Sequence, residues 1–158
     1  MFELGTIVIR GSYCSIFIGE QTNIDQSSCL TCIDNESVIE IGEKCDINPN
    51  CKIISMEGKT VTLGRSCLLS YDVEIRNSDS HSLLSVDNKR INPAKNITIA
   101  NNVWISRNSL ILKGSVIGAN SVVGANSVVT KSFGNNCLIA GQPAKIIKEE
   151  ICWKKERI

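Results

Sequence analysis

The sequence predicts an all-β solenoid, a parallel β-helix whose coils are three-sided and built from hexapeptides. Three observations lead to this fold: a six-residue period of aliphatic residues, a small residue four positions after most of them, and asparagine or glycine at the turns. The period is unbroken in one stretch, whose members are Ile99, Ile105, Ile111, Ile117, Val123 and Val129. A period of six fits neither a helix nor an alternating strand, and it is typical of hexapeptide solenoids.

Each element of this pattern has a physical role in a triangular coil. One aliphatic side chain per side points inward, and successive coils stack about 4.8 Å apart, which is the ordinary strand spacing. Small residues fit the corners, namely Val103, Ser109, Ser115, Ser121 and Ser127. Turn positions carry residues that tolerate unusual backbone angles, namely Asn102, Asn108, Gly114, Asn120 and Asn126. The alternative is a sandwich of short hairpins, which would require a period of two and two-residue glycine turns.

Along the chain, residues 1–17 fit the period poorly and predict an imperfect first coil. The period begins at Ile18 and is reset by short insertions at Asp34–Ser37 and Met56–Lys59. We expect the whole chain, residues 1–158, to form a single β-helix domain.

A longer interruption surrounds the only histidine of the chain. The residue six positions after Ile75 is His81, within the polar stretch NSDSHSLLSVDNKRINPAK. The period returns at Ile99, which lies eighteen residues after His81, the length of one coil. We therefore expect residues 77–96 to form a projecting loop, and unstructured loops of this length are usually functional or disordered.

The period stops after Val129, and the chain ends in a different pattern. Residues 146–158 are predicted to form a short amphipathic helix with Ile147, Ile151 and Trp153 facing inward. Such a helix would close the open end of the solenoid and cover its edge strands.

Composition excludes several classes of function. The net charge of +1 argues against nucleic-acid binding, and no apolar run is long enough for a membrane span. The N-terminal residues lack the pattern of a secretory leader. Three of the eight cysteines, Cys45, Cys51 and Cys67, occupy the small-residue position of the period, which favours free thiols in a reduced cytoplasm. The pair Cys29 and Cys32 has too few companion ligands for zinc, so we expect no metal site.

Two stretches resemble a known family. VWISRNSLILKGSVIGANSVVGANSVVT, followed by IAGQPAKIIKE, is similar to the C-terminal half of the hexapeptide-repeat acyltransferases. VTLGRSCLLSYDVEIRNSDSH resembles the segment before the catalytic histidine of the galactoside, maltose and xenobiotic acetyltransferases, and SDSHSL is closer to sugar and capsular-polysaccharide O-acetyltransferases. The resemblance implies a left-handed coil, a homotrimer and the use of acetyl-CoA or another acyl-CoA.

Other proteins built from this repeat fit less well. The γ-class carbonic anhydrases need three histidines for their metal, and this chain has one. Serine acetyltransferases carry a helical N-terminal domain, for which the chain has no room. Sugar nucleotidyltransferases carry a Rossmann-like half with a glycine-rich loop that is absent here.

Acyl transfer from a thioester to a hydroxyl requires a base that takes the proton of the attacking alcohol. His81 is the candidate, because a neutral imidazole is available at cellular pH. Asp79 lies two residues before it and either orients the imidazole or caps a turn. In the family a glycine commonly precedes the histidine, and here that position is Ser80.

The resemblance also implies binding residues. Trp104 matches an aromatic beside the active site, where it would pack against the histidine loop or contact acyl-CoA or the acceptor. Asn50 matches loosely an acceptor-binding asparagine. Ser106 corresponds to a residue near the thioester arm. Ala125 lies in the stretch where the family has G-A-G-S, and here Asn126 replaces the second glycine. The residues expected near the adenosine end and its phosphates are Thr130, Lys131 and Lys145.

These expectations combine into one function with two alternatives. The chain is expected to transfer acetyl from acetyl-CoA to a hydroxyl of a sugar or polysaccharide in polysaccharide biosynthesis, with His81 as general base. One alternative is N-acetylation of a nucleotide-linked amino sugar. The other is a non-catalytic trimeric scaffold, which the intact SDSHS segment argues against.

Overall fold

The computed structural model describes residues 5–157, and these residues form a column of stacked three-sided coils. Nineteen strands lie in three sheets, one along each side of the column, and every pair of neighbours is parallel except the last. Residues 1–4 of the predicted first coil, and residue 158, lie outside the described part. From residue 6 onward the predicted first coil is present, because its three strands, β1 (Thr6–Arg10), β2 (Ser15–Ile18) and β3 (Asn23–Ile24), pair with the strands of the second coil.

The first sheet contains β1 (Thr6–Arg10), β4 (Cys29–Ile33), β7 (Lys52–Ser55), β10 (Glu74–Arg76), β13 (Leu110–Leu112) and β16 (Val128–Val129). The second sheet contains β2 (Ser15–Ile18), β5 (Val38–Ile41), β8 (Thr60–Leu63), β11 (Ile97–Ile99), β14 (Val116–Ile117) and β17 (Ser132–Phe133). The third sheet contains β3 (Asn23–Ile24), β6 (Asp46–Ile47), β9 (Leu68–Leu69), β12 (Trp104–Ile105), β15 (Val122–Val123), β18 (Leu138–Gly141) and β19 (Ala144–Lys148).

The six-residue period builds the core as predicted. Ile75 is in register with Ile111, and Ile99 with Leu63, so aliphatic side chains stack from coil to coil. All six aliphatics of the unbroken period are at most 1% exposed. The column therefore has a continuous apolar interior without a large globular core.

The small-residue positions are buried and hydrogen-bonded. The Cys45 thiol donates to the Gly64 carbonyl at 3.0 Å, and the Cys51 thiol to the Ser70 carbonyl at 2.9 Å. Ser109 Oγ donates in the same way to the Gly124 carbonyl at 3.0 Å. All eight cysteines are free. Cysteine and serine are interchangeable here because each is small and donates one hydrogen bond to the next coil.

Asparagines occupy six left-handed backbone positions at two corners, and the lower coils have other residues there, namely Gln21, Lys44, Ser66 and Asp72. Asn102, Asn120 and Asn136 have φ of 54–59° between the second and third sheets, while Asn50, Asn108 and Asn126 have φ of 57–63° between the third and first. Asparagine is among the few residues that adopt this conformation readily.

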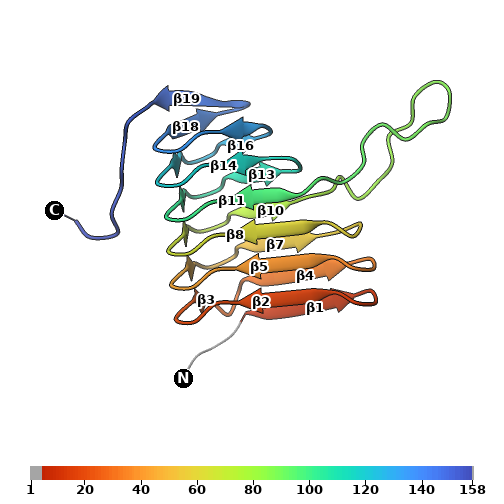
Figure 1. Ribbon diagram of the computed structural model, residues 1–158, viewed down its shortest axis with the longest axis horizontal. Coiled ribbons are helices and arrows are strands. Elements are labelled where there is room, and N and C mark those ends of the chain that lie inside the picture. Colours follow the sequence, from red (N-terminus) through yellow and green to blue (C-terminus); the bar gives the residue numbers. More distant parts are fainter. Residues whose placement is uncertain (1–4, 158) are drawn as a thin grey trace.

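All insertions in the period fall at the remaining corner, between the first and second sheets. Residues 34–37 join β4 to β5, residues 56–59 join β7 to β8, and residues 77–96 join β10 to β11. The last of these leaves the column as a long projection (Figure 1). The corner directly above it is closed by the short turn of residues 113–115.

The predicted C-terminal helix does not form, and residues 5–157 contain no helix. Instead β19 pairs antiparallel with β18 at the top of the column. A helix would have left the outer edge of β18 unpaired, whereas β19 satisfies its backbone groups. Ile147 is therefore 62% exposed rather than inward, and Ile151 is half-buried.

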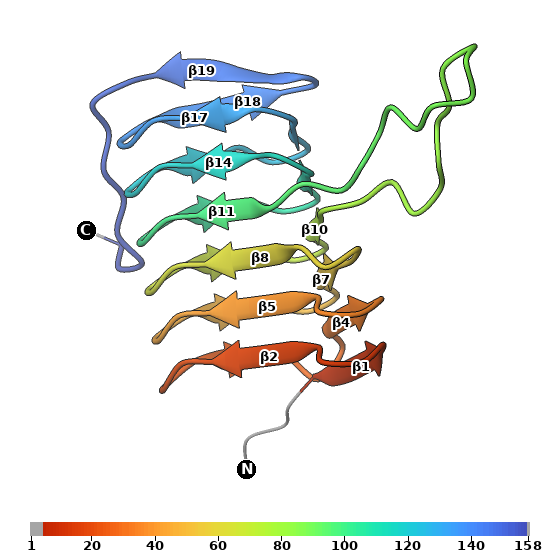
Figure 2. The same ribbon diagram turned by 45° about the vertical axis from the view of Figure 1, so that its right-hand side comes forward.

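Beyond β19 the chain turns and descends along the outside of the column. This segment, residues 149–157, is called the tail (Figure 2). The Ile151 amide donates to the Asn136 carbonyl at 2.9 Å, and Trp153 Nε1 donates to the Asn102 carbonyl at 2.7 Å. Lys155 forms an ion pair with Asp46 lower on the column.

Candidate functional site

The loop of residues 77–96 carries His81 away from the column. Asn77 and Ser78, at its start, are buried, and a single antiparallel bridge joins Leu84 to Arg90 farther out. Both views show the loop on one side of the column and the tail on the opposite side (Figures 1 and 2). The loop replaces one corner turn, so the strands on either side of it keep their register with the coils above and below.

His81 has a fixed backbone and an exposed side chain. Its carbonyl accepts a hydrogen bond from Asn92 Nδ2 at 2.8 Å, while within residues 5–157 no group hydrogen-bonds its imidazole. Ser80, just before it, has a φ of 65°, the conformation for which glycine is favoured. Its hydroxyl accepts a hydrogen bond from Arg76 Nη2 at 2.7 Å.

Asp79 lies in the same loop, but its carboxylate is bound to other groups. It accepts hydrogen bonds from Lys113 Nζ at 2.5 Å and from Asn92 Nδ2 at 2.7 Å. The hydrogen bond from Lys113, and then that from Asn92, hold the pKa of this carboxyl below its ordinary value. The carboxylate is therefore an anion paired with Lys113, and no hydrogen bond joins it to the imidazole.

A second acidic group holds the loop from below. Glu57, in the turn that joins β7 to β8, accepts two hydrogen bonds from the Arg90 guanidinium, both at 2.7 Å. Ser78 Oγ donates to it at 2.6 Å. These bonds, with the Arg90 contribution largest, lower the pKa of Glu57 to about 2.

The sequence pattern did not single out Glu57, Arg90, Asn92 or Lys113. One signal was present for Glu57, since it lies in the insertion Met56–Lys59 that interrupts the period. The roles of Arg90, Asn92 and Lys113 can be recognised only after the coils have stacked. Lys113 and its partner Asp79, for example, are 34 residues apart in the chain.

Trp104 lies on the third sheet, away from the corner where the loop leaves. Its Nε1 donates to Ser70 Oγ at 3.0 Å. Its ring packs against that of Trp153 in the tail, with the centroids 5.8 Å apart and the planes at 44°. Within one chain, therefore, Trp104 and His81 are not brought together.

The remaining predicted site residues fall at two corners and on the last strand. Thr130 and Lys131 are exposed at the corner from which the loop projects, with Lys131 Nζ 5.5 Å from the centre of the Phe133 ring. At the corner between the third and first sheets lie Asn50, Ser106 and Ala125. Lys145 is exposed on β19.

That second corner forms a shallow groove beside Ala125. Its walls include Asp72, Arg107, Asn108 and Asn126. Arg107 Nε lies 3.3 Å from an Asp72 carboxylate oxygen, and Asn50 Nδ2 donates to the other at 3.3 Å. The groove is polar and carries both signs of charge.

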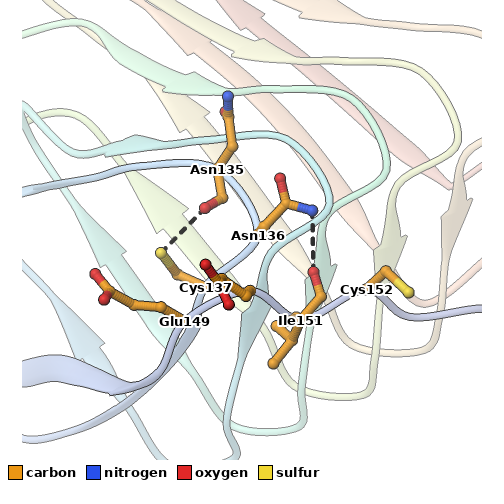
Figure 3. A pocket seen from close by; sticks show the side chains of 7 residues that line it. Asn135, Asn136, Cys137, Glu149, Ile151 and Cys152 are labelled. Carbon is orange, nitrogen blue, oxygen red and sulfur yellow. Dashed lines mark hydrogen bonds between the residues drawn. The ribbon is translucent and has the colours of Figure 1, made fainter.

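Another hollow lies where the tail begins, far from the loop (Figure 3). Asn136 Nδ2 donates there to the Ile151 carbonyl at 3.0 Å, and the Cys137 thiol donates to the Asn135 carbonyl at 3.2 Å. Glu149 and the neighbouring acidic residue Glu150 also line it. The bond between Asn136 and Ile151 holds the tail against the column.

Residues 5–157 contain neither a cluster of metal ligands nor a membrane-spanning helix. No group of three His, Cys, Asp or Glu side chains is arranged to hold a metal ion. No helix of the described part is long and apolar enough to cross a membrane.

The sequence is similar to a known protein family and to curated proteins. The family described as "Bacterial transferase hexapeptide (six repeats)" matches residues 96–131. A polysialic acid O-acetyltransferase from Escherichia coli O1:K1 / APEC is 41% identical over 120 residues, which is 75% of this chain and 39% of that protein. The chain spans 39%, 53% and 58% of the lengths of the three curated relatives that it matches.

Solved structures extend the similarity to nearly the whole chain. A polysialic acid O-acetyltransferase superposes with a TM-score of 0.72 at 30% identity, covering 97% of this chain and 93% of that one. A hexapeptide-repeat acetyltransferase from Vibrio cholerae O1 biovar eltor, solved with acetyl-CoA, superposes with a TM-score of 0.60 at 24% identity. That match covers 89% of this chain and 70% of the other, and it bears on the fold alone. The chain, a left-handed parallel β-helix, belongs to the hexapeptide-repeat acyltransferase family.

Proposed function

We propose that this chain is an acetyl-CoA-dependent O-acetyltransferase that modifies a hydroxyl of a sugar or surface polysaccharide. The observation that carries the proposal is the lone imidazole of His81, exposed on a projecting loop whose backbone is held by hydrogen bonds. The polysialic acid O-acetyltransferases among its relatives support a glycan acceptor. The eight free cysteines fit a reducing cytoplasm as its location.

In this mechanism His81 acts as general base. Its neutral imidazole takes the proton of the acceptor hydroxyl while the hydroxyl oxygen attacks the carbonyl carbon of the acetyl thioester. The tetrahedral intermediate collapses, the C–S bond breaks, and the CoA thiolate takes the proton back from the imidazolium. Asp79 helps to hold the loop in place, because its carboxylate is bound to Lys113 and Asn92.

We propose a homotrimer as the active form, because one chain separates Trp104 from His81. A threefold assembly would let the loop of one protomer reach the neighbouring protomer and complete a cleft between them. Four exposed aliphatic residues on the loop support a contact with a second copy, namely Leu83, Leu84, Val86 and Ile91.

Acetyl-CoA would then lie along the outside of the column. The pantetheine arm would lie beside one corner, where Ser106 is half-buried and Ala125 is exposed. Thr130, Lys131 and Lys145 offer a hydroxyl and two ammonium groups near the adenosine phosphates. Trp104 would contact the acetyl group or the acceptor, and Asn50 the acceptor.

The test is acetyl transfer from acetyl-CoA to a panel of hydroxyl and amino sugars and acidic polysaccharides, followed by release of free thiol. We expect His81→Ala to remain a folded trimer by light scattering and to lose ~10²–10⁴ of turnover. Turnover near the wild-type rate in that variant would remove His81 from the mechanism. Transfer to amino sugars alone would favour N-acetylation, and a failure to bind CoA in calorimetry would favour the scaffold.

A further inference from the structure

The loop that carries His81 is bound to the coil below it and to the coil above it. Below it, Glu57 binds the Arg90 guanidinium through two parallel hydrogen bonds of 2.7 Å. Above it, Lys113 reaches down from the turn after β13 and binds the Asp79 carboxylate at 2.5 Å. The two ion pairs therefore connect the loop to the coil below and to the coil above.

Asn92 joins these two ion pairs to the backbone of His81. Its Nδ2 donates to Asp79 Oδ2 at 2.7 Å and to the His81 carbonyl at 2.8 Å. Its Oδ1 accepts from the Leu83 amide at 2.7 Å and from Arg90 Nε at 3.4 Å. An asparagine amide offers two donors and two acceptor positions, so all four are used.

Burial makes this arrangement rigid. Asn92 is 6% exposed, although most of the loop around it is open to solvent. Its own carbonyl accepts a further hydrogen bond from Lys113 Nζ at 3.1 Å. A buried amide whose partners are all made has one favourable orientation, since any rotation would leave buried donors unpaired.

We infer that Asn92 is a positioning residue for the reaction. It fixes the backbone of His81 relative to the column while leaving the imidazole exposed. The loop around Asn92 is bound to the two adjacent coils, to one through Arg90 and Glu57 and to the other through Lys113. This inference rests on the proposed function, in which His81 must meet a thioester bound along the column. A displacement of about 1 Å in a reacting group can lower turnover about 10²-fold, so a loop base requires such an anchor.

The experiment uses the fact that His81 is the only histidine. In untagged full-length protein the imidazole gives a single set of NMR signals, which report its position without any substrate. We expect Asn92→Ala to move this signal toward that of an unstructured histidine. We expect it to lower kcat ~10–100-fold and to leave the KM for acetyl-CoA unchanged.

A matched control lies in the same loop. Asn88 is exposed at the tip with a φ of 58°, and within residues 5–157 its side chain makes no hydrogen bond. Asn88→Gly keeps that backbone conformation and should leave both the imidazole signal and kcat at wild-type values. Lys113→Met is a second variant, because it removes the upper ion pair and the bond to the Asn92 carbonyl while leaving the Asn92 side chain in place.

The inference is overturned if the imidazole signal stays at its wild-type position in both Asn92→Ala and Lys113→Met. It is overturned as well if the kcat of Asn92→Ala equals that of Asn88→Gly in an enzyme that needs His81. Full activity in His81→Ala would refute the general-base mechanism, and the imidazole signal would still decide whether Asn92 anchors the loop.

Discussion

Replacing Asn108 with valine should destabilise the protein by about 2 kcal/mol, because two features of the corner are lost together. Asn108 has a φ of 57°, which is strained for a β-branched residue by roughly 1–2 kcal/mol. Its Nδ2 also donates to Asn126 Oδ1 at 2.6 Å. That bond joins successive coils but is exposed, so its net contribution is about 0.5 kcal/mol.

Glycine at the same position separates the two contributions. Asn108→Gly loses the hydrogen bond but accepts the left-handed conformation without strain, at some cost in backbone entropy. We expect it to destabilise the protein by about 1 kcal/mol, which is less than valine does.

Urea denaturation of the two variants and the wild type, followed by circular dichroism, measures the difference. The dependence of the unfolding free energy on urea concentration should be the same for all three proteins. The urea concentration at the midpoint of unfolding should fall in the order wild type, glycine variant, valine variant. Equal midpoints for the glycine and valine variants would show that left-handed strain does not explain the asparagines of the corners.

Two further predictions concern the loop anchor and the tail. The lowered pKa of Glu57 means that its ionised form stabilises the folded state above the ordinary pKa of 4.5 and that this stabilisation disappears as pH falls toward about 2. The stability difference between wild type and Glu57→Gln should therefore shrink with acidification, and a difference independent of pH would contradict the role of the pair with Arg90. Because the chain has two tryptophans, Trp153→Phe and Trp153→Ala each leave Trp104 as the sole tryptophan, whose fluorescence can be excited selectively. Acrylamide should quench Trp104 more strongly in the alanine variant, and equal quenching would show that the tail does not cover it.

The column could be predicted because the aliphatic residues that build it recur every six positions along the chain. Each inward aliphatic, such as Ile105 or Ile117, is identified by a neighbour six residues away, and both are fully buried. The free thiols at small-residue positions followed from the same spacing. The departure at residue 77 and the return at residue 97 were visible as the longest break in the period.

The prediction of a C-terminal helix over residues 146–158 was wrong for an equally physical reason. The spacing of Ile147 and Ile151 suits one face of a helix, and the sequence does not reveal that β18 presents an open edge. Backbone pairing with that edge favours a strand whatever the side chains prefer. The same limit applies to the bonds of Asp79, because its pairing with Lys113 joins residues 34 positions apart in the chain.

Spacing along the chain was enough to predict the three-sided column, the departure of the loop near residue 77 and the lone imidazole on that loop. The groups that hold the loop and the position of the tail depend on how the coils stack. Lys113 meets Asp79 across 34 residues and Trp153 meets Asn102 across 51, and such contacts exist only after the coils have stacked.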